Sequence, residues 1–339
     1  MEFFVTQILN VEFKARALNL SEIKNKLIKL SARDLGIDHQ IDTYFNTPYG
    51  RLKHRKGQIE NSLIFYNRTD EVGPRQSKVV LEKISAGNSL EKILEVSNGV
   101  KVVVDKKRQI FFIDNVKFHL DTVEGLGTFF EIEAIDDSGD FAQGKKIKLE
   151  KQCAYYLELF NISSKDFIDL SYSDLIIEKN LYQEANLFLE RLEENQKALE
   201  IDLFKFPIDH LCYRVENIFD YYYKKEIFAK LGVLLIESEI DGRLISTYKL
   251  KRPIEFKKQK IYLIELPAPK FNNAYKEGFE HAEAVISDSF KKFMASYPRL
   301  KFDLSAADKK VNPEIRLKLA PGINIKFHHQ SLEDVILIE

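Results

Sequence analysis

The chain of 339 residues is 45% hydrophobic and 30% charged, which is ordinary for a globular protein and long enough for two domains. Its 51 Lys and Arg residues nearly balance its 52 Asp and Glu residues, and the net charge of -1 gives the whole molecule no attraction for nucleic acid or an anionic membrane. Any anion-binding site must therefore be local.

The two cysteines, Cys153 and Cys212, lie far apart in the sequence. This spacing excludes a disulfide scaffold and a CxxC metal knuckle, and it suits a reducing cytosol. The opening MEFFVTQILN has no signal-peptide pattern, and no apolar run approaches the roughly 18 residues of a membrane-spanning helix. We expect a soluble cytoplasmic protein that binds neither nucleic acid nor membranes, and a homodimer is compatible with this prediction.

Alternating polar and apolar residues predict the first strands of the chain. In NVEFKARA the charged residues share one strand face, since side chains alternate along a strand: Glu12, Lys14 and Arg16. A helix then starts at the N-cap candidate Ser21 and runs through SEIKNKLIKLSARDLG. The stretch QIDTYFNTPYGRLKHRKG predicts two strands joined by a turn, and the second strand has basic residues on a common face: Arg51, Lys53 and Arg55.

The later strands repeat this two-faced pattern. NSLIFYNRTD and GPRQSKVVLEKI contribute the bases Arg68 and Lys78, and DKKRQIFF contributes Lys106, Lys107 and Arg108. The segment NVKFHLDTVEGLGTFFEIEA predicts a hairpin around VEGLG. The polar faces of its two strands carry the following residues: Lys117, His119, Asp121, Glu131 and Glu133.

Positive and negative charges are sorted by strand in this region. Residues 51–55, 64–68 and 105–108 carry bases, whereas 119–121 and 131–133 carry acids. If the sheet closes with these faces inward, carboxylates can hold a divalent cation and bases a triphosphate, because magnesium prefers one or two carboxylates plus phosphate oxygens. A polar face that meets solvent is the other interpretation, and alternation alone leaves both open.

Several of these motifs together resemble the CYTH superfamily, and most of all its class IV adenylate cyclase branch. They occur in the family's order within residues 1–178: VEFKAR, DTYFNTPYGRLKHR, LIFYNR, DKKRQIFF, FHLDTVEGLGTFFEIEAI and DFIDLSYSDLI. The resemblance implies an α+β fold in which a closed antiparallel β-tunnel with flanking helices turns its acids and bases inward.

The resemblance also implies roles for single residues. The family's ExExK signature falls on Asn10, Glu12 and Lys14, so Asn10 replaces its first Glu. The implied ligands of Mg2+ or Mn2+ are Glu12, Glu131 and Glu133. The implied phosphate-binding bases are Arg51, Lys53, Arg68, Lys78 and Arg108. The implied catalytic residues are Asp121, Lys14 and Lys107.

Three functions follow for this tunnel. We rank first an adenylate cyclase that converts ATP to cyclic AMP and pyrophosphate, second a triphosphatase acting on thiamine triphosphate or inorganic triphosphate, and third a non-catalytic triphosphate-binding module. The cyclase and the hydrolase need nearly the same tunnel. The sequence does not show whether an adenine lies at the tunnel mouth, so these alternatives stay open.

A change of pattern predicts the boundary between two domains. The first domain closes with a helix in GKKIKLEKQCAYYLELF, and a separate helix, LYQEANLFLERLEENQKAL, then opens new material. We therefore place the boundary near Glu178 to Leu181, with domains at residues 1–178 and 179–339.

From Ile208 the chain shows a weak internal repeat. IDHLCYRV, a helix and three strands form one βαβββ unit, and FEHAEAVI, a helix and later strands form a shorter second one. His210 then matches His281, and Glu265 matches His328. If the units pack about a pseudo-twofold axis, these four residues meet in one cleft and suit zinc, iron, manganese or nickel. The alternative is that each His is a hydrogen-bonded core residue.

The segments DHLCYRV, GRLISTYKL, IELPAPK and GFEHAEAVI resemble the YecM-like members of the vicinal oxygen chelate superfamily over about residues 183–339. The resemblance implies paired βαβββ units and metal ligands at His210, Glu265, His281 and His328, with His329 as an alternative to His328. Arg214 and Glu283 become candidates for contacts with the ligands or a substrate. This domain is then a metal-dependent enzyme or a module that binds an unknown small molecule.

Overall fold

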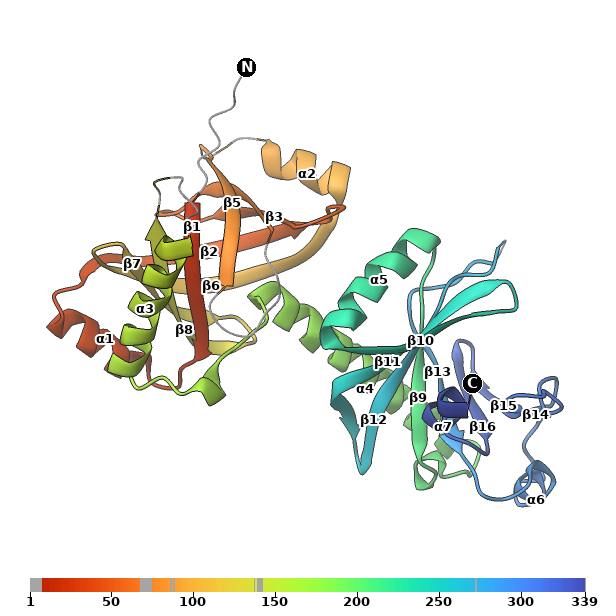
Figure 1. Cartoon of the computed structure of the whole chain (residues 1–339). Coiled ribbons are helices and arrows are strands. Elements are labelled where there is room, and N and C mark those ends of the chain that lie inside the picture. The colour runs from red at the N-terminus through yellow and green to blue at the C-terminus, as the bar shows by residue number, and fades with distance from the viewer. Residues whose placement is uncertain are drawn as a thin grey trace. The chain divides into compact units, whose positions relative to one another are not determined.

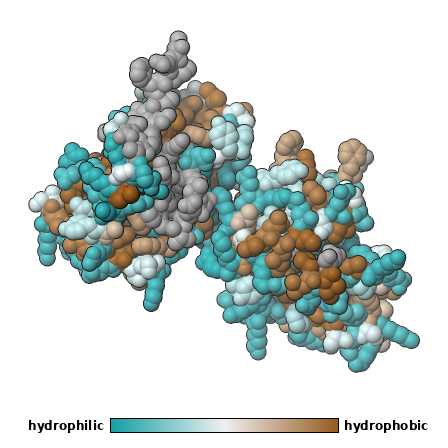
Figure 2. All heavy atoms as spheres, in the orientation of Figure 1, coloured by the Kyte–Doolittle hydropathy of each residue, from teal (hydrophilic) through white to brown (hydrophobic). Residues whose placement is uncertain are grey.

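The computed structural model describes residues 8–67, 75–85, 87, 89–136, 138, 143–271 and 273–338. The chain divides into two compact units, Met1–Ile177 and Glu178–Glu339, and both mix helices with strands. Hydrophilic side chains cover most of the surface seen in Figure 2, although the second unit also shows a hydrophobic area. Among the described residues, every helix is too short or too polar to cross a membrane.

The first unit is an antiparallel barrel that is closed over its described residues, as predicted (Figure 1). Its strands are β1 (Ile8–Arg16), β2 (Arg33–Phe45), β3 (Arg51–Lys56), β4 (Ser62–Asn67), β5 (Arg75–Lys83), β6 (Val100–Ile113), β7 (Val116–Val123) and β8 (Gly127–Asp136). Around the barrel they follow the order β1-β5-β4-β3-β2-β6-β7-β8. Strand β1 closes the barrel by pairing with β5 and with β8.

The apolar faces of several barrel strands point outward because helices cover them. Helices α1 (Leu20–Lys29) and α3 (Gln143–Leu159) pack against β8, and α3 also packs against β1. They share one hydrophobic core with Val11, Phe118 and Phe130. Since side chains alternate along a strand, the charged faces of these strands turn into the lumen. This packing decides between the two interpretations that alternation left open.

Two helix predictions are corrected. Asn19 caps α1 in place of Ser21, because the helix already begins at Leu20 and the Asn19 side chain accepts a hydrogen bond from the Glu22 amide. Helix α4 (Tyr172–Lys197) runs without a break, so the separate helix predicted from Leu181 is wrong. Its 26 residues include no Gly or Pro that could interrupt the ladder of backbone hydrogen bonds. The first unit also contains α2 (Leu90–Asn98) and the 3-10 helix η1 (Ser164–Asp166).

An aromatic cluster from the barrel interior packs on the start of α4. Tyr172 and Leu175 contact a group that includes Tyr44, Tyr66 and Phe129. The lumen therefore combines a charged region with an apolar, aromatic one.

The second unit consists of two βαβββ halves, as predicted. The first half contains β9 (Ile208–Arg214), α5 (Ile218–Leu231), β10 (Gly232–Ile240), β11 (Arg243–Phe256) and β12 (Gln259–Pro267). The second half contains β13 (Gly278–Val285), α6 (Phe290–Ala295), β14 (Phe302–Asp303), β15 (Glu314–Ala320) and β16 (Ile323–His328). The described strands form one sheet in the order β10-β11-β12-β9-β13-β16-β15-β14. The 3-10 helix η2 (Leu203–Lys205) and the helix α7 (Leu332–Ile338) flank the repeat.

Strands β9 and β13 pair antiparallel at the centre of this sheet, with β12 parallel to β9 and β16 parallel to β13. A pseudo-twofold axis therefore runs between β9 and β13. His210 lies opposite Glu283, and His281 lies opposite Cys212. The axis exchanges His210 with His281, as predicted, and Cys212 with Glu283.

The match between Glu265 and His328 is wrong by two residues. Glu265 lies beside Cys212 in the parallel pair of the first half, and Lys326 lies beside Glu283 in that of the second half. Glu265 therefore corresponds to Lys326. The strand register, which the sequence repeat did not reveal, decides this pairing.

Candidate functional site

The barrel lumen of the first unit contains a cavity of about 620 Å³. This volume lies within the roughly 300–1,000 Å³ of pockets that bind small molecules. The carboxylates in its lining are Glu12, Asp42, Glu60, Glu131 and Glu133. The bases in its lining are Lys14, Lys53, Arg55, Lys83, Lys106, Arg108 and Lys117.

An acidic centre lies where β1 meets β8. Glu12 is opposite Glu133 in this pair, and the Asn10 amide donates a hydrogen bond to Glu133. Burial and the neighbouring carboxylates Glu12, Glu60 and Glu131 raise the pKa of Glu133, although Lys117 opposes them. Mutual repulsion of this kind is relieved when a divalent cation binds between carboxylates.

Glu131 is held by bases instead. Its carboxylate lies 3.0 Å from Lys14 Nζ and 2.6 Å from Arg108 Nη2. Burial acts against ionisation, but Lys14 and Arg108 hold the pKa of Glu131 well below its usual range. Lys14 also lies 3.9 Å from the centre of the Tyr172 ring. The predicted ligand Glu131 and the predicted catalytic residue Lys14 therefore form a direct ion pair.

The basic part of the lumen is organised around Asp42. Its carboxylate accepts hydrogen bonds from Lys53 Nζ at 2.8 Å, Arg55 Nε at 2.8 Å and Lys106 Nζ at 2.7 Å. Arg51 instead binds Asp174 of α4 at 2.8 Å. These contacts hold several bases side by side, which is the arrangement that a polyphosphate chain requires.

Asp121 is fully buried and accepts hydrogen bonds from Arg108 Nε at 2.7 Å and from the Tyr172 hydroxyl at 2.8 Å. Both contacts orient groups that face the cavity. The predicted catalytic residue Asp121 therefore holds the side chains of Arg108 and Tyr172 by hydrogen bonds.

Lys107 does not face the lumen. It is exposed on the outside of β6, whereas Lys106 and Arg108 point inward and are buried. Adjacent residues of a strand point to opposite faces, so Lys107 and Arg108 could not both line the tunnel. Arg68 lies outside the described residues, and Lys78 belongs to β5, but its side chain is outside the described part.

Sequence reasoning did not select several residues of the lumen. Arg55, Lys106, Lys117 and His119 share strand faces with selected residues, so alternation was a usable signal for them. Glu60 comes from the turn between β3 and β4, where no periodicity operates. Asp42 and Tyr172 also line the site, and nothing in the sequence pattern singled them out.

In the second unit, three histidines converge on Glu283. Nε2 of His281 and Nε2 of His210 lie 3.1 Å and 3.3 Å from Glu283 Oε1, and Nε2 of His328 lies 3.8 Å from Glu283 Oε2. These residues are nearly fully buried. The structure therefore brings together the three predicted histidines, with Glu283 at their centre.

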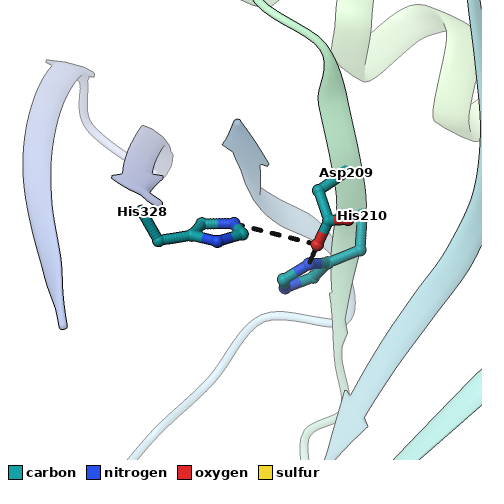
Figure 3. A group of neighbouring side chains, drawn as sticks. All are labelled: Asp209, His210 and His328. Carbon is teal, nitrogen blue, oxygen red and sulfur yellow. Dashed lines mark hydrogen bonds and ion pairs between the residues drawn. The ribbon is translucent and has the colours of Figure 1, made fainter. Parts of the chain in front are cut away.

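Each of these rings is held through its other nitrogen. Nδ1 of His210 lies 2.7 Å from the Asp209 carboxylate, Nδ1 of His281 lies 3.4 Å from Glu280, and Nδ1 of His328 contacts the Gln330 carbonyl. Figure 3 shows Asp209 between the His210 and His328 rings. Histidines that bind a metal in proteins are held in this way, because the outer hydrogen bond fixes the tautomer and the ring orientation.

The donor set fits a metal ion. In a tetrahedral site with bonds of about 2.0–2.1 Å, neighbouring ligand atoms are about 3.3 Å apart. The distances from His281 Nε2 and His210 Nε2 to Glu283 Oε1, 3.1 Å and 3.3 Å, match this distance between ligand atoms. Glu265, His210 and Glu283 can also offer ligand atoms that lie within 4.8 Å of one another. Nε2 of His328 is buried without a hydrogen-bond partner in the described part of the chain.

Other residues in this region differ from their predicted places. Lys326 corresponds to Glu265 in the repeat, so a positively charged side chain occupies this position in the second half. Its Nζ lies 2.6 Å from the Glu283 carboxylate. His329 lies apart from this cluster: it is exposed, its Nδ1 lies 3.1 Å from the Ile286 carbonyl oxygen and its ring stacks on Phe290. Arg214 forms an ion pair with Glu280.

Residues 9–161 match the family model of the CYTH domain, and residues 178–339 match that of the YecM protein. An uncharacterized protein of Haemophilus influenzae is 33% identical over 100 residues, which are 30% of this chain and 52% of that protein. The chain thus spans about half the length of that relative. Protein YecM of Escherichia coli is 26% identical over 166 residues, which are 45% of this chain and 88% of that protein. The solved structure of PH1012 protein from Pyrococcus horikoshii is 26% identical with a TM-score of 0.42, over 49% of this chain and 98% of that one.

Proposed function

Since the chain joins a CYTH domain to a YecM domain, we propose that its first unit is a divalent-metal-dependent enzyme that acts on an organic triphosphate, as an adenylate cyclase forming cyclic AMP and pyrophosphate from ATP. The CYTH match supports an enzyme of the triphosphate tunnel family. The observation that carries the proposal is the closed lumen in which an acidic centre lies among bases.

The acidic centre fits Mg2+ or Mn2+. Glu12 and Glu133 offer carboxylate oxygens, which are the ligands that these hard cations prefer, and the pKa of Glu133 is raised by burial and like-charged neighbours. When bound there, the metal would polarise a phosphate group and stabilise the negative charge that builds up on its oxygens. Glu131 lies two residues before Glu133 on the same face of β8, where Lys14 and Arg108 hold its carboxylate beside the acidic centre.

The bases fit the phosphate chain. Lys53, Arg55 and Lys106 all contact Asp42, so phosphate oxygens would compete with this carboxylate for hydrogen bonds that are already oriented. Arginine engages two oxygens at once, and lysine supplies a point charge. In the cyclase reaction, the ribose 3'-oxygen bonds to the α-phosphorus as the bond to pyrophosphate breaks, and the hydroxyl proton leaves with the pyrophosphate. These bases would stabilise the leaving pyrophosphate.

His119 is suited to orient the attacking hydroxyl. Its Nδ1 lies 3.1 Å from Glu131, which can only accept when ionised, so Nδ1 carries the proton. Nε2 is buried without a hydrogen-bond partner in the described part of the structure, and the side chain lines the cavity. Burial, Arg108 and Lys117 lower the pKa of His119 to about 4, which keeps Nε2 an acceptor at neutral pH.

The aromatic part of the lumen supports an organic substrate over inorganic triphosphate. Tyr44, Tyr66, Ile64 and Tyr172 line the same cavity as the bases. Tripolyphosphate has no apolar part that would gain from such a surface, whereas a nucleoside does.

For the second unit we propose a metal centre that serves a small-molecule enzyme or binding site. The convergence of three histidines on Glu283 supports it. His210, His281 and Glu283 would hold the metal with Glu265, and the mixed imidazole and carboxylate ligands suit zinc, iron, manganese or nickel.

Incubation with ATP and Mg2+ or Mn2+, followed by chromatography of the products, tests the main proposal. Cyclic AMP and pyrophosphate are the expected products. Release of orthophosphate from ATP, thiamine triphosphate or inorganic triphosphate would identify a triphosphatase instead. Absence of any product, together with a higher melting temperature in the presence of ATP, would identify a binding module.

A further inference from the structure

Glu60 reaches the tunnel from the turn between β3 and β4. Its carboxylate lines the cavity and contacts Arg55 at 2.7 Å, Gln40 at 2.9 Å and Lys117 of β7. Lys117 is the residue opposite Glu133 in the pair of β7 with β8. Glu60 therefore approaches the acidic centre from a different side of the barrel than Glu12 and Glu133.

A buried carboxylate holds this turn in place. Asp38 accepts hydrogen bonds from the backbone amides of Gln58 at 2.7 Å, Ile59 at 3.0 Å and Glu60 at 3.0 Å, and it is completely buried. A Cβ at Gly57 would come within 2.5 Å of Asp38. Burying a charge is unfavourable unless hydrogen bonds satisfy it, and here those bonds fix the backbone that carries Glu60.

Asn10 lies on the same side of the cavity as Glu133 and is 6% exposed. Its Nδ2 donates to Glu133, and its Oδ1 is buried without a hydrogen-bond partner in the described part of the chain. A buried amide oxygen without a donor is unfavourable. Amide oxygens are also cation ligands, so a metal held by Glu133 would satisfy Oδ1.

We propose that Glu60 and the Asn10 amide oxygen join Glu12 and Glu133 around the divalent cation, so that the β3–β4 turn supplies a further carboxylate to this centre. This inference rests on the proposed metal-dependent function of the tunnel. Glu60 and Glu133 line the same cavity, and Lys117, which lies opposite Glu133 in the pair of β7 with β8, contacts the Glu60 carboxylate. With Glu60 turned toward the cation, Arg55 Nη1 and Lys117 Nζ would be available to phosphate, while Arg55 would remain bound to Asp42 through Nε.

The test is Mn2+ binding, followed by the electron paramagnetic resonance signal of free Mn2+. All measurements use the full chain with His210→Ala and His281→Ala, which removes the proposed second metal centre. Glu60→Gln is expected to weaken Mn2+ binding at least about 10-fold, as loss of even an indirect metal contact does. Glu124→Gln, on the exposed turn between β7 and β8, is the matched control and is expected to change nothing.

Adding Asn10→Glu to Glu60→Gln distinguishes a lost ligand from a damaged fold. It is expected to restore binding, because a carboxylate returns to the same centre. Binding that is unchanged in Glu60→Gln, or is not restored by Asn10→Glu, would overturn the inference. Glu12→Gln separates this outcome from failure of the proposed function. If Glu12→Gln also binds Mn2+ normally, or the parent chain binds none, the proposed metal site in the tunnel is wrong, and with it the metal-dependent function.

Discussion

His210 and Glu283 face each other across the central strand pair of the second unit, with His210 Nε2 3.3 Å from Glu283 Oε1. His281 Nε2 lies 3.1 Å from the same oxygen. The two halves of the repeat therefore meet at one carboxylate. Lys326 contacts this oxygen too, so a cation already balances its charge.

Glu283→Gln should weaken binding of Co2+ or Zn2+ to the second unit by at least about 10-fold, because it removes the charged oxygen on which the histidines converge. Isothermal titration of the metal-free chain measures this. Glu255→Gln, at an exposed glutamate of β11, is the control. Equal metal affinity in both variants would show that Glu283 is not part of the metal centre.

Asp209→Asn should weaken the same metal by about 10- to 100-fold, because Asp209 holds His210 through Nδ1 without being needed as a ligand itself. His210→Ala should weaken it more. Metal analysis of the purified variants provides the comparison, and circular dichroism checks that both are folded. A larger loss in Asp209→Asn than in His210→Ala would show that their roles are assigned the wrong way round.

Glu131→Ala combined with Glu133→Ala should abolish metal-dependent turnover of the triphosphate, since the double variant removes the acidic centre and the partner of Lys14. Product formation at several Mg2+ concentrations is the measurement. Full activity of this variant would be incompatible with the metal assignment.

Lys106→Ala should weaken ATP binding by roughly 10- to 100-fold, because a hydrogen bond to a charged group contributes about 1.5–3 kcal/mol. Lys53 and Arg55 would still neutralise Asp42, so the fold should persist. Lys107→Ala is a control from the neighbouring position and should bind ATP normally, because Lys107 is exposed on the outer face. Calorimetric titration with ATP compares them, and the reverse order of effects would contradict the inward orientation of Lys106.

Cys153 should resist alkylation at pH 8 in the folded protein. It is fully buried, and burial raises the pKa of its thiol to about 12. The thiolate is the reactive form, so a raised pKa leaves almost none of it below pH 10. In a Cys212→Ser variant, mass spectrometry should detect iodoacetamide labelling only after unfolding. Rapid labelling of the native variant at pH 8 would contradict the buried position.

Alternation in the sequence by itself determined much of this protein. It predicted which side chains share a strand face, from Glu12 with Lys14 to Glu131 with Glu133, and the repeat predicted the two βαβββ halves with His210 matched to His281. These features are local, because side-chain direction along a strand has a period of two residues.

Only the tertiary structure decided which way those faces point. The charged face turns into the lumen because α1 and α3 cover the apolar face, and no strand carries that information alone. The same packing places Lys106 inside and Lys107 outside. Glu60 enters the site from a turn, and Glu283 meets His210 through the register of β9 with β13. Both depend on contacts between residues far apart in the chain, which sequence periodicity cannot encode.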